Sequence, residues 1–301
     1  MNEHEFECYK KAGQIASEVK KFIFDYVQSG MKLIDIARAI DSKIVELGGE
    51  WGFPVNLSID KVAAHYTPDP SDDSVASGLL KVDFGVAIDG YIADTAISLD
   101  LTEEGRHKDM IDLNQKILNN ITQKICKGTE VREVGNTAQD TLEEWNDKND
   151  TSYSIIKSLS GHSLDKDTIH AGLTISNYRN ENRRELSNMA FAIEPFVTTG
   201  VGDIYEGKGG GIYALQADEP VRDRDAREIL RYVKEKFKSR PFCLRWLEGK
   251  GFNKLRYVLS MLVKQGILHE YPMLIEKSKA PVSQVENTFV VRGDEVVVST
   301  A

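Results

Sequence analysis

Two aspartates lie in neighbouring β-rich runs of the sequence. Asp83 is inside one apolar run and Asp94 is inside the next, with the dipeptide Asp89-Gly90 between them. An Asp-Gly pair flanked by such runs is typical of a tight hairpin turn, and the turn brings both carboxylates to one face of the hairpin. Two like charges on one face repel each other, and a shared cation would remove that repulsion. An aspartate on an edge strand facing water is the alternative for Asp83.

Three further side chains are candidates for the same site, and each has a structural alternative. His162 follows a glycine, where a histidine is more often an ordinary loop residue. Glu194 ends an apolar run and precedes a proline, with a salt bridge to an arginine as the alternative. Glu286 comes directly before a β-rich run and is alternatively a surface residue that begins a strand. The residue pattern alone leaves all three open.

Together, these four carboxylates and one imidazole make an oxygen-rich ligand set. Such a set suits hard or borderline divalent ions, namely manganese, iron(II), cobalt or zinc. Five ligands with four negative charges exceed what one catalytic ion with an open position needs, so we expect a pair of ions. Two ions a few ångströms apart can activate water, polarise a carbonyl and anchor an amine. The pattern favours metal-assisted hydrolysis.

Other motifs carry no comparable chemistry. Residues 83–85 spell the metal-binding tripeptide of protein kinases, but neither a preceding glycine-rich loop nor a His-Arg-Asp loop is present. Residues 207–211 are rich in glycine and contain a lysine, but they lack the spacing of a phosphate-binding loop, so we expect a flexible surface turn. The three cysteines form no Cys-x-x-Cys pair, and we therefore expect neither a disulfide framework nor a thiolate metal site.

Composition bounds the class of protein. The chain has 301 residues, 41% of them hydrophobic, which is enough for a sizeable core. Its net charge of -9 makes it a poor candidate for stable nucleic-acid binding. The N-terminal stretch is charged and lacks the apolar region of a secretory signal. No run of about 18 apolar residues suggests a membrane span. We therefore expect a cytoplasmic protein.

Hydrophobic periodicity predicts an α+β fold in which the order helix, helix, strands occurs twice. This order suggests a structural duplication, although no repeat is visible in the residues themselves. We expect a catalytic domain of residues 1–211 and 273–301, and a helical insertion at 212–272. The predicted helices cover 5–28, 34–47, 105–126, 130–147, 223–237 and 252–264, and the predicted strands cover 55–59, 80–84, 91–97, 154–157, 190–193, 196–198, 289–291 and 295–299.

Five segments resemble those of one known enzyme family, the type II methionine aminopeptidases, and most of all its short archaeal form. The resemblance covers nearly the entire chain, the segments occur in the family's order, and the spacing from Asp83 to Asp94 matches. Together the segments are very specific, although each alone would be weak. They are Ala63–Pro68, Lys81–Ala96, Ser160–His162, Ile169–Gly172 and Phe191–Phe196.

The resemblance implies a pita-bread fold, in which two related α/β halves curl a pseudo-twofold antiparallel sheet with outer helices around two metal ions. It also implies a winged-helix-like insertion, which would be the helical segment expected at 212–272. Asp83 would chelate one ion, and His162 and Glu194 the other. Asp94 and Glu286 would bridge the two.

The resemblance also implies a substrate site beside the metals. His65 and His170 would contact the scissile peptide and assist proton transfer, together with Glu194. Without the resemblance, each histidine would be read as a packed or surface residue, and the apolar residues as ordinary core. The expected methionine pocket, whose walls suit an unbranched thioether, consists of Phe53, Ile169, Phe196 and Tyr271.

The implied reaction is hydrolytic removal of the N-terminal initiator methionine from nascent proteins whose second residue is small. A dinuclear metal centre would activate the water. The implied enzyme is a monomer without membrane contact, transiently near the ribosome. Ala87, Val285 and Asn287 depart from residues that are frequent in the family, which affects the expected pocket shape rather than the ligand set. Two rivals share the fold: an Xaa-Pro peptidase, which uses the same five ligands, and a non-catalytic pita-bread binding protein, which lacks them.

Overall fold

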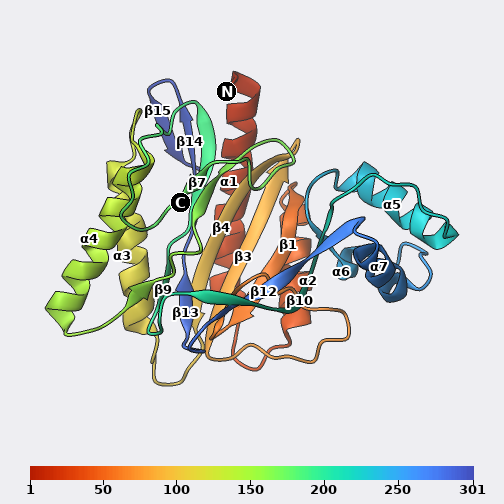
Figure 1. Cartoon of the computed structure of the whole chain (residues 1–301), viewed down its shortest axis with the longest axis horizontal. Coiled ribbons are helices and arrows are strands. Elements are labelled where there is room, and N and C mark those ends of the chain that lie inside the picture. Colours follow the sequence, from red (N-terminus) through yellow and green to blue (C-terminus); the bar gives the residue numbers. More distant parts are fainter.

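The computed structural model describes residues 1–301, which form two similar halves and a smaller group of helices to one side (Figure 1). In each half, two long helices cover an antiparallel sheet. None of the seven helices combines the length and apolar character that a membrane span requires. The order helix, helix, strands therefore does occur twice, as the sequence suggested.

The first half begins with helix α1, whose start is fixed by a capping box between Asn2 and Glu5. The apolar faces of α1 and α2 pack on a three-stranded sheet of order β1-β3-β4, and this packing forms a core of 20 buried residues. The elements are α1 (Glu3–Tyr26), α2 (Leu33–Glu46), β1 (Glu50–Ile59), β3 (Leu79–Ile88) and β4 (Tyr91–Asp100).

The turn between β3 and β4 is the predicted two-residue hairpin. Asp89 and Gly90 have φ values of 52° and 85°, and positive φ at both central residues is the mark of a type I′ turn. The register pairs Asp83 with Ala96 and Gly85 with Asp94. Asp83 and Asp94 are therefore diagonal neighbours on one face of the sheet, as the sequence predicted.

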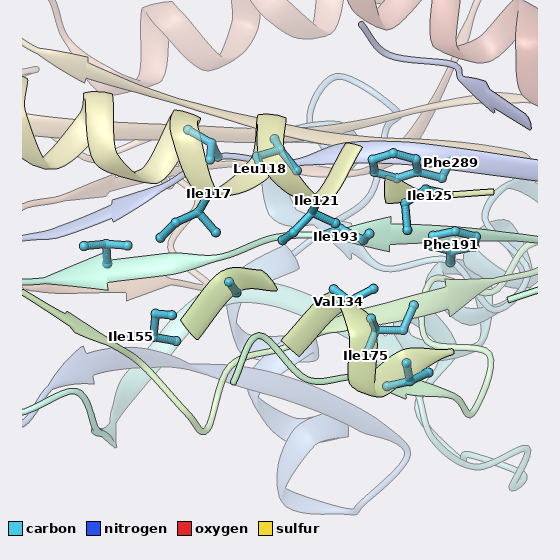
Figure 2. Packing of buried hydrophobic residues seen from close by; sticks show 14 of the residues in the cluster. Ile117, Leu118, Ile121, Ile125, Val134, Ile155, Ile175, Phe191, Ile193 and Phe289 are labelled. Atoms are coloured by element: carbon cyan, nitrogen blue, oxygen red, sulfur yellow. The ribbon is translucent and has the colours of Figure 1, made fainter. Parts of the chain in front are cut away.

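The second half repeats the arrangement with α3 and α4. Figure 2 shows Ile117 and Ile121 of α3 lying over Ile193 and Phe289 of the sheet, within a core of 21 buried residues. The strands form sheets of order β13-β9-β5 and β15-β14-β8-β6-β7. The elements are α3 (Lys108–Lys124), α4 (Val131–Asn149), β5 (Ser154–Ile155), β6 (Gly161–Leu164), β7 (Thr174–Ile175), β8 (Met189–Ile193), β9 (Phe196–Thr198), β13 (Val282–Gln284), β14 (Asn287–Arg292) and β15 (Glu295–Val298).

The two halves join where β4 meets the start of β14. The Glu286 amide donates to the Ala96 carbonyl at 3.0 Å, and the Thr95 hydroxyl donates to the Glu286 carbonyl at 2.7 Å. The Thr288 hydroxyl accepts from the Asp94 amide and donates to the Asp94 carbonyl, both at 2.8 Å. The junction thus fixes the backbone of two carboxylate residues, Asp94 and Glu286, that are far apart in the sequence.

A fourth sheet, of order β11-β10-β12-β2, crosses the front of the two halves. The prediction of a flexible surface turn at 207–211 is wrong, because these residues lie within β10 and pair with β12, with Gly209 opposite Pro272. A glycine-rich strand has little intrinsic β propensity, so only its pairing with β12 reveals it. The strands are β2 (Val62–Ala64), β10 (Ile204–Leu215), β11 (Phe242–Cys243) and β12 (Leu268–Glu276).

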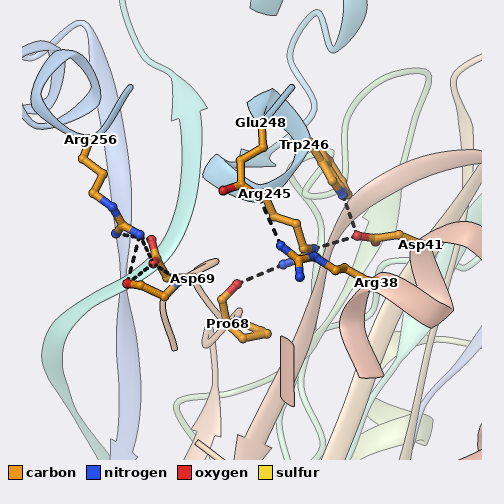
Figure 3. A network of polar contacts seen from close by, with 9 residues as sticks. Arg38, Asp41, Pro68, Asp69, Arg245, Trp246, Glu248 and Arg256 are labelled. Atoms are coloured by element: carbon orange, nitrogen blue, oxygen red, sulfur yellow. Dashed lines mark hydrogen bonds and ion pairs between the residues drawn. The ribbon is translucent and has the colours of Figure 1, made fainter. Parts of the chain in front are cut away.

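The three remaining helices lie between β10 and β12 and share a core of 15 buried residues. They dock on the first half through a buried polar network (Figure 3). Arg245 donates to the Asp41 carboxylate at 2.7 Å, and the Trp246 indole donates to the same oxygen at 2.9 Å. Trp246 also stacks on Trp51. The helices are α5 (Arg224–Lys236), α6 (Leu244–Leu247) and α7 (Leu255–Lys264).

Replacing Asp41 with alanine should destabilise the protein by about 3–5 kcal/mol, because it leaves the buried Arg245 charge without its partner. Urea unfolding measures the loss. The matched control is Asp69→Ala, which removes the more exposed ion pair between Asp69 and Arg256 and should cost less than about 1 kcal/mol. Equal losses in the two variants would contradict the prediction.

Candidate metal centre

A cavity of about 540 Å³ lies between the two halves and the fourth sheet. Its walls combine charged groups with apolar side chains. All eleven site residues expected from the sequence line this cavity: Phe53, His65, Asp83, Asp94, His162, Ile169, His170, Glu194, Phe196, Tyr271 and Glu286.

The five candidate ligands come from five different strands or strand ends. Asp83 lies on β3, Asp94 on β4 and His162 on β6, while Glu194 directly follows β8 and Glu286 directly precedes β14. The His162 Nε2 atom is 3.4 Å from Glu194 Oε1 and 3.7 Å from Asp94 Oδ2. Ligand atoms of Asp94, His162 and Glu286 all lie within 4.8 Å of one another.

The four carboxylates are buried together and repel one another. Burial raises the pKa of Asp83 to about 7. Burial, followed by repulsion from the neighbouring carboxylates, raises the pKa values of Asp94, Glu194 and Glu286 well above the ordinary range. In a protein these shifts indicate charged groups that lack compensating positive charge.

Several atoms of the cluster have no hydrogen-bond partner although they are buried. They are Asp83 Oδ1, Asp94 Oδ1, His162 Nδ1 and Glu286 Oε1. Unsatisfied buried oxygens that converge on one cavity are costly unless a cation binds them. The cluster therefore fits divalent ions that prefer oxygen and imidazole ligands.

His162 is held in its neutral form. Burial, together with the nearby His170, lowers the pKa of His162 to about 3. The His170 ring lies edge-on to the His162 ring, with 4.3 Å between centroids. Neutral imidazole is the form that binds metal ions, so His162 is ready to act as a ligand at neutral pH.

His65 lies on the opposite wall in an unusual backbone conformation. Its φ of 65° places a non-glycine residue in the left-handed region, where strain concentrates at functional sites. Its ring meets the Tyr271 ring edge-on at 5.4 Å. Burial, followed by the effect of His170, lowers the pKa of His65 to about 4, so His65 is neutral at pH 7.

Gly210 on β10 supports His65, and the sequence analysis missed it. A Cβ atom at Gly210 would lie 1.7 Å from the His65 carbonyl oxygen. The Gly210 carbonyl also accepts from the Thr67 amide at 2.9 Å. Only glycine allows the two backbones to approach this closely.

Gln284 is a second residue that sequence reasoning missed. Its side-chain nitrogen donates to Asp83 Oδ2 at 3.3 Å and to Glu194 Oε2 at 3.4 Å. It therefore connects two carboxylates that come from different halves. Its position two residues before Glu286 was the only available signal, and that spacing is too common to identify it.

The apolar side of the cavity continues beyond the four expected residues. Ile212 of β10 and Leu274 of β12 also line it. The Phe53 ring lies against Gly85, where a Cβ atom would be 2.5 Å from the ring. The fourth sheet thus supplies part of the wall that faces the carboxylates.

Comparison with known proteins shows the family and the fold of the chain. The sequence model of metallopeptidase family M24 matches residues 7–222. A methionine aminopeptidase from Thermococcus onnurineus is 36% identical over 98% of this chain and 99% of its own. A thermophilic Arx1 structure superposes with a TM-score of 0.82 at 18% identity, covering 99% of this chain and 91% of that one. The methionine aminopeptidase of Rickettsia prowazekii has a TM-score of 0.68 at 18% identity, covering 100% and 98%.

The fold and site define a metallopeptidase with the pita-bread architecture, two α/β halves around a carboxylate-rich cavity. The chain belongs to metallopeptidase family M24, and its relatives that match over nearly their full length include methionine aminopeptidases. Divalent metal ions are the cofactors of this class. The low-identity structures support the fold alone.

Replacing Asp83 with asparagine should stabilise the metal-free protein at pH 8 by about 1–3 kcal/mol, because it removes one buried, repelled charge. The folded pKa of Asp83, about 7, exceeds that of an exposed aspartate, about 3.9. Ionisation therefore opposes folding, and the Asp83 contribution to stability falls as pH rises through this window. Urea unfolding in chelator at pH 4 and pH 8 measures the difference.

The difference in the free energy of unfolding between Asp83→Asn and the wild type should be small at pH 4, where Asp83 is protonated. Added divalent ions should stabilise the wild type more than the variant. The matched control is Asp112→Asn at an exposed position of α3, which should change stability little at either pH. If the wild type were more stable than Asp83→Asn at pH 8 in chelator, charge repulsion at Asp83 would not be what destabilises the metal-free protein.

Replacing Gly210 with alanine should lower kcat/KM for a Met-Ala-Ser peptide by roughly 10- to 100-fold, because the new Cβ displaces His65. Steady-state kinetics measure the loss. Gly209→Ala is the matched control, since its Cβ meets only the end of the Glu270 side chain, which can move aside. Equal activity in the two variants would show that the close approach does not position His65.

Proposed function

We propose that this protein removes the N-terminal methionine from peptides and nascent chains whose second residue is small. The observation that supports the proposal best is the cavity itself. One wall carries four carboxylates and a neutral imidazole, and the adjoining wall is apolar. A peptide can place its methionine side chain on the apolar wall and its amine and scissile carbonyl at the charged one.

We assign the cluster to two ions, drawn from cobalt, manganese, iron(II) and zinc. In this assignment, Asp83 holds one ion, His162 and Glu194 hold the other, and Asp94 and Glu286 bridge them. The short distances around His162 Nε2 and the unpaired carboxylate oxygens support it. Such ions, when bound, activate water and polarise a carbonyl.

The protein's own groups would manage the proton and the substrate. Glu194, whose pKa is raised, is suited to accept a proton from the attacking water and to return it to the leaving amine. His170 adjoins the ligands, and His65, which directly follows β2 of the fourth sheet, lines the same cavity. Both are neutral at pH 7, so each can donate one hydrogen bond to the scissile peptide without adding charge.

The methionine pocket in this proposal is formed by the apolar wall. Phe53, Ile169, Phe196 and Tyr271 line the cavity beside the carboxylates. An unbranched thioether fills irregular apolar space well and makes favourable contacts with aromatic ring edges. This wall therefore favours methionine over a charged or β-branched first residue.

We further propose that the chain is of type II, with residues 212–272 as its winged-helix-like helical insertion and residues 1–211 and 273–301 as its catalytic domain. The insertion has its own core. Strands β10 and β12 pass through both proposed boundaries, so they carry the insertion into the cavity wall. We propose a cytoplasmic monomer that meets its substrates near the ribosome.

Replacing Glu194 with glutamine should lower kcat for a Met-Ala-Ser peptide by about 10³-fold or more, because the variant loses a ligand charge and the proton acceptor. Release of free methionine, measured under a panel of added metal ions, tests this. Glu206→Gln, at an exposed position on β10, should keep full activity. A fully active Glu194→Gln enzyme would overturn the mechanism.

Two measurements on the wild type separate the rivals. An Xaa-Pro peptidase would cleave an Xaa-Pro dipeptide in preference to Met-Ala-Ser. A non-catalytic binding protein would cleave neither and would hold no ions at the cluster, whereas the proposed enzyme holds two. Elemental analysis of protein loaded with each metal decides the second point.

A further inference from the structure

A second group of metal-binding side chains lies where the start of α1 meets the tip of the β3–β4 hairpin. His4 and Cys8 are four residues apart on α1 and therefore lie on one face of the helix. Asp89 comes from the hairpin turn. Ligand atoms of the three residues all lie within 4.8 Å of one another.

Two of the three separations in this group resemble those around a tetrahedral metal ion. A tetrahedral site with bonds of about 2.3 Å to sulfur and about 2.0–2.1 Å to nitrogen and oxygen places sulfur and nitrogen about 3.5 Å apart, and nitrogen and oxygen about 3.4 Å apart. Here Cys8 Sγ is 3.7 Å from His4 Nε2, and His4 Nε2 is 3.3 Å from Asp89 Oδ2. The sulfur is also 4.0 Å from His4 Nδ1, so the exposed imidazole must rotate to share an ion with Cys8.

Hydrogen bonds satisfy these three groups only weakly. If His4 Nε2 carries a proton, it can donate to Asp89, and the Cys8 thiol then has only a long approach of 4.0 Å to His4 Nδ1. If Nε2 is unprotonated, it can accept from the thiol, but the Asp89 carboxylate faces a second acceptor. A cation bound by all three groups would satisfy them at once.

The surroundings allow an ion to enter and to be held. The His4 side chain is 65% exposed, whereas Cys8 is only 5% exposed. Tyr91 lies edge-on to the His4 ring. The buried thiol favours a cation with affinity for sulfur and imidazole, such as zinc or cobalt, over magnesium or calcium.

We propose that His4, Cys8 and Asp89 bind one zinc-class cation, with water as the fourth ligand, at a site separate from the carboxylate centre. On binding, the Cys8 thiol loses its proton to solvent and its sulfur bonds to the ion. The ion ties the first turns of α1 to the turn of the hairpin that carries Asp83 and Asp94. The proposal does not depend on the proposed function.

The proposed site runs against the sequence-based expectation that the chain has no thiolate metal site. That expectation rested on the absence of paired cysteines in the sequence. The three residues instead combine one helical face with a distant turn, and a search for Cys-x-x-Cys spacing cannot find such a combination. Only the packing of α1 against the hairpin brings them together.

Cobalt provides a specific test, because a thiolate bound to cobalt(II) absorbs in the near ultraviolet. None of the five residues of the carboxylate centre contains sulfur, so this band cannot come from that centre. Titration of tag-free protein with cobalt should produce the band with one ion bound beyond those at the centre. Zinc should abolish the band by displacement.

Two variants and one control complete the test. Cys8→Ser should abolish the band and one equivalent of bound ion, and His4→Ala, at an exposed position, should weaken binding at least tenfold. Cys126→Ser, which removes the exposed cysteine, should change neither. Both variants should keep wild-type cleavage of Met-Ala-Ser. The proposal would be overturned if the wild type showed no band or bound the ion with a dissociation constant above about 1 mM. It would also be overturned if the band survived in Cys8→Ser, was lost in Cys126→Ser, or if His4→Ala bound the ion with unchanged affinity.

Discussion

The mutual repulsion of four buried carboxylates is the constraint on which the rest of this structure depends. Burial and repulsion raise the pKa values of Asp83, Asp94, Glu194 and Glu286, and several of their oxygens have no hydrogen-bond partner. Left alone, such a cluster would oppose folding. Divalent ions bound in the cavity offset the repulsion between the carboxylates. The same repulsion therefore destabilises the metal-free protein and favours cations as its cofactors.

Repelling groups stay together only if rigid elements hold them. The β4–β14 junction holds Asp94 and Glu286 through backbone hydrogen bonds, supplemented by Thr95 and Thr288. Gln284 donates to carboxylates of both halves. The duplicated architecture places this junction on the axis between the two halves, and each half supplies part of the ligand set. The site therefore cannot form in one half alone.

The segment between β10 and β12 completes the cavity from a third direction, through Ser239 and Pro241 of the loop after α5. Its helices dock on α2 through the buried pair of Arg245 and Asp41. A second contact joins Arg240, Lys238 and Ser239 to Asp167, three residues before His170. Their docking is therefore connected to the loop that carries a histidine beside the metals, and a change in docking would reach the site through this loop.

The sequence alone determined the Asp-Gly hairpin, the face shared by Asp83 and Asp94, and the approximate ranges of the long helices, because these features depend on local chemistry. A turn type and an alternating pattern are decided within a few residues. Family resemblance, rather than local pattern, supplied His162, Glu194 and Glu286. Only the tertiary structure decided that the glycines at 207–211 form a strand against His65, that Gln284 connects two carboxylates, and that His4, Cys8 and Asp89 meet. Each of these depends on contacts between segments distant in the chain, whose geometry no local propensity encodes.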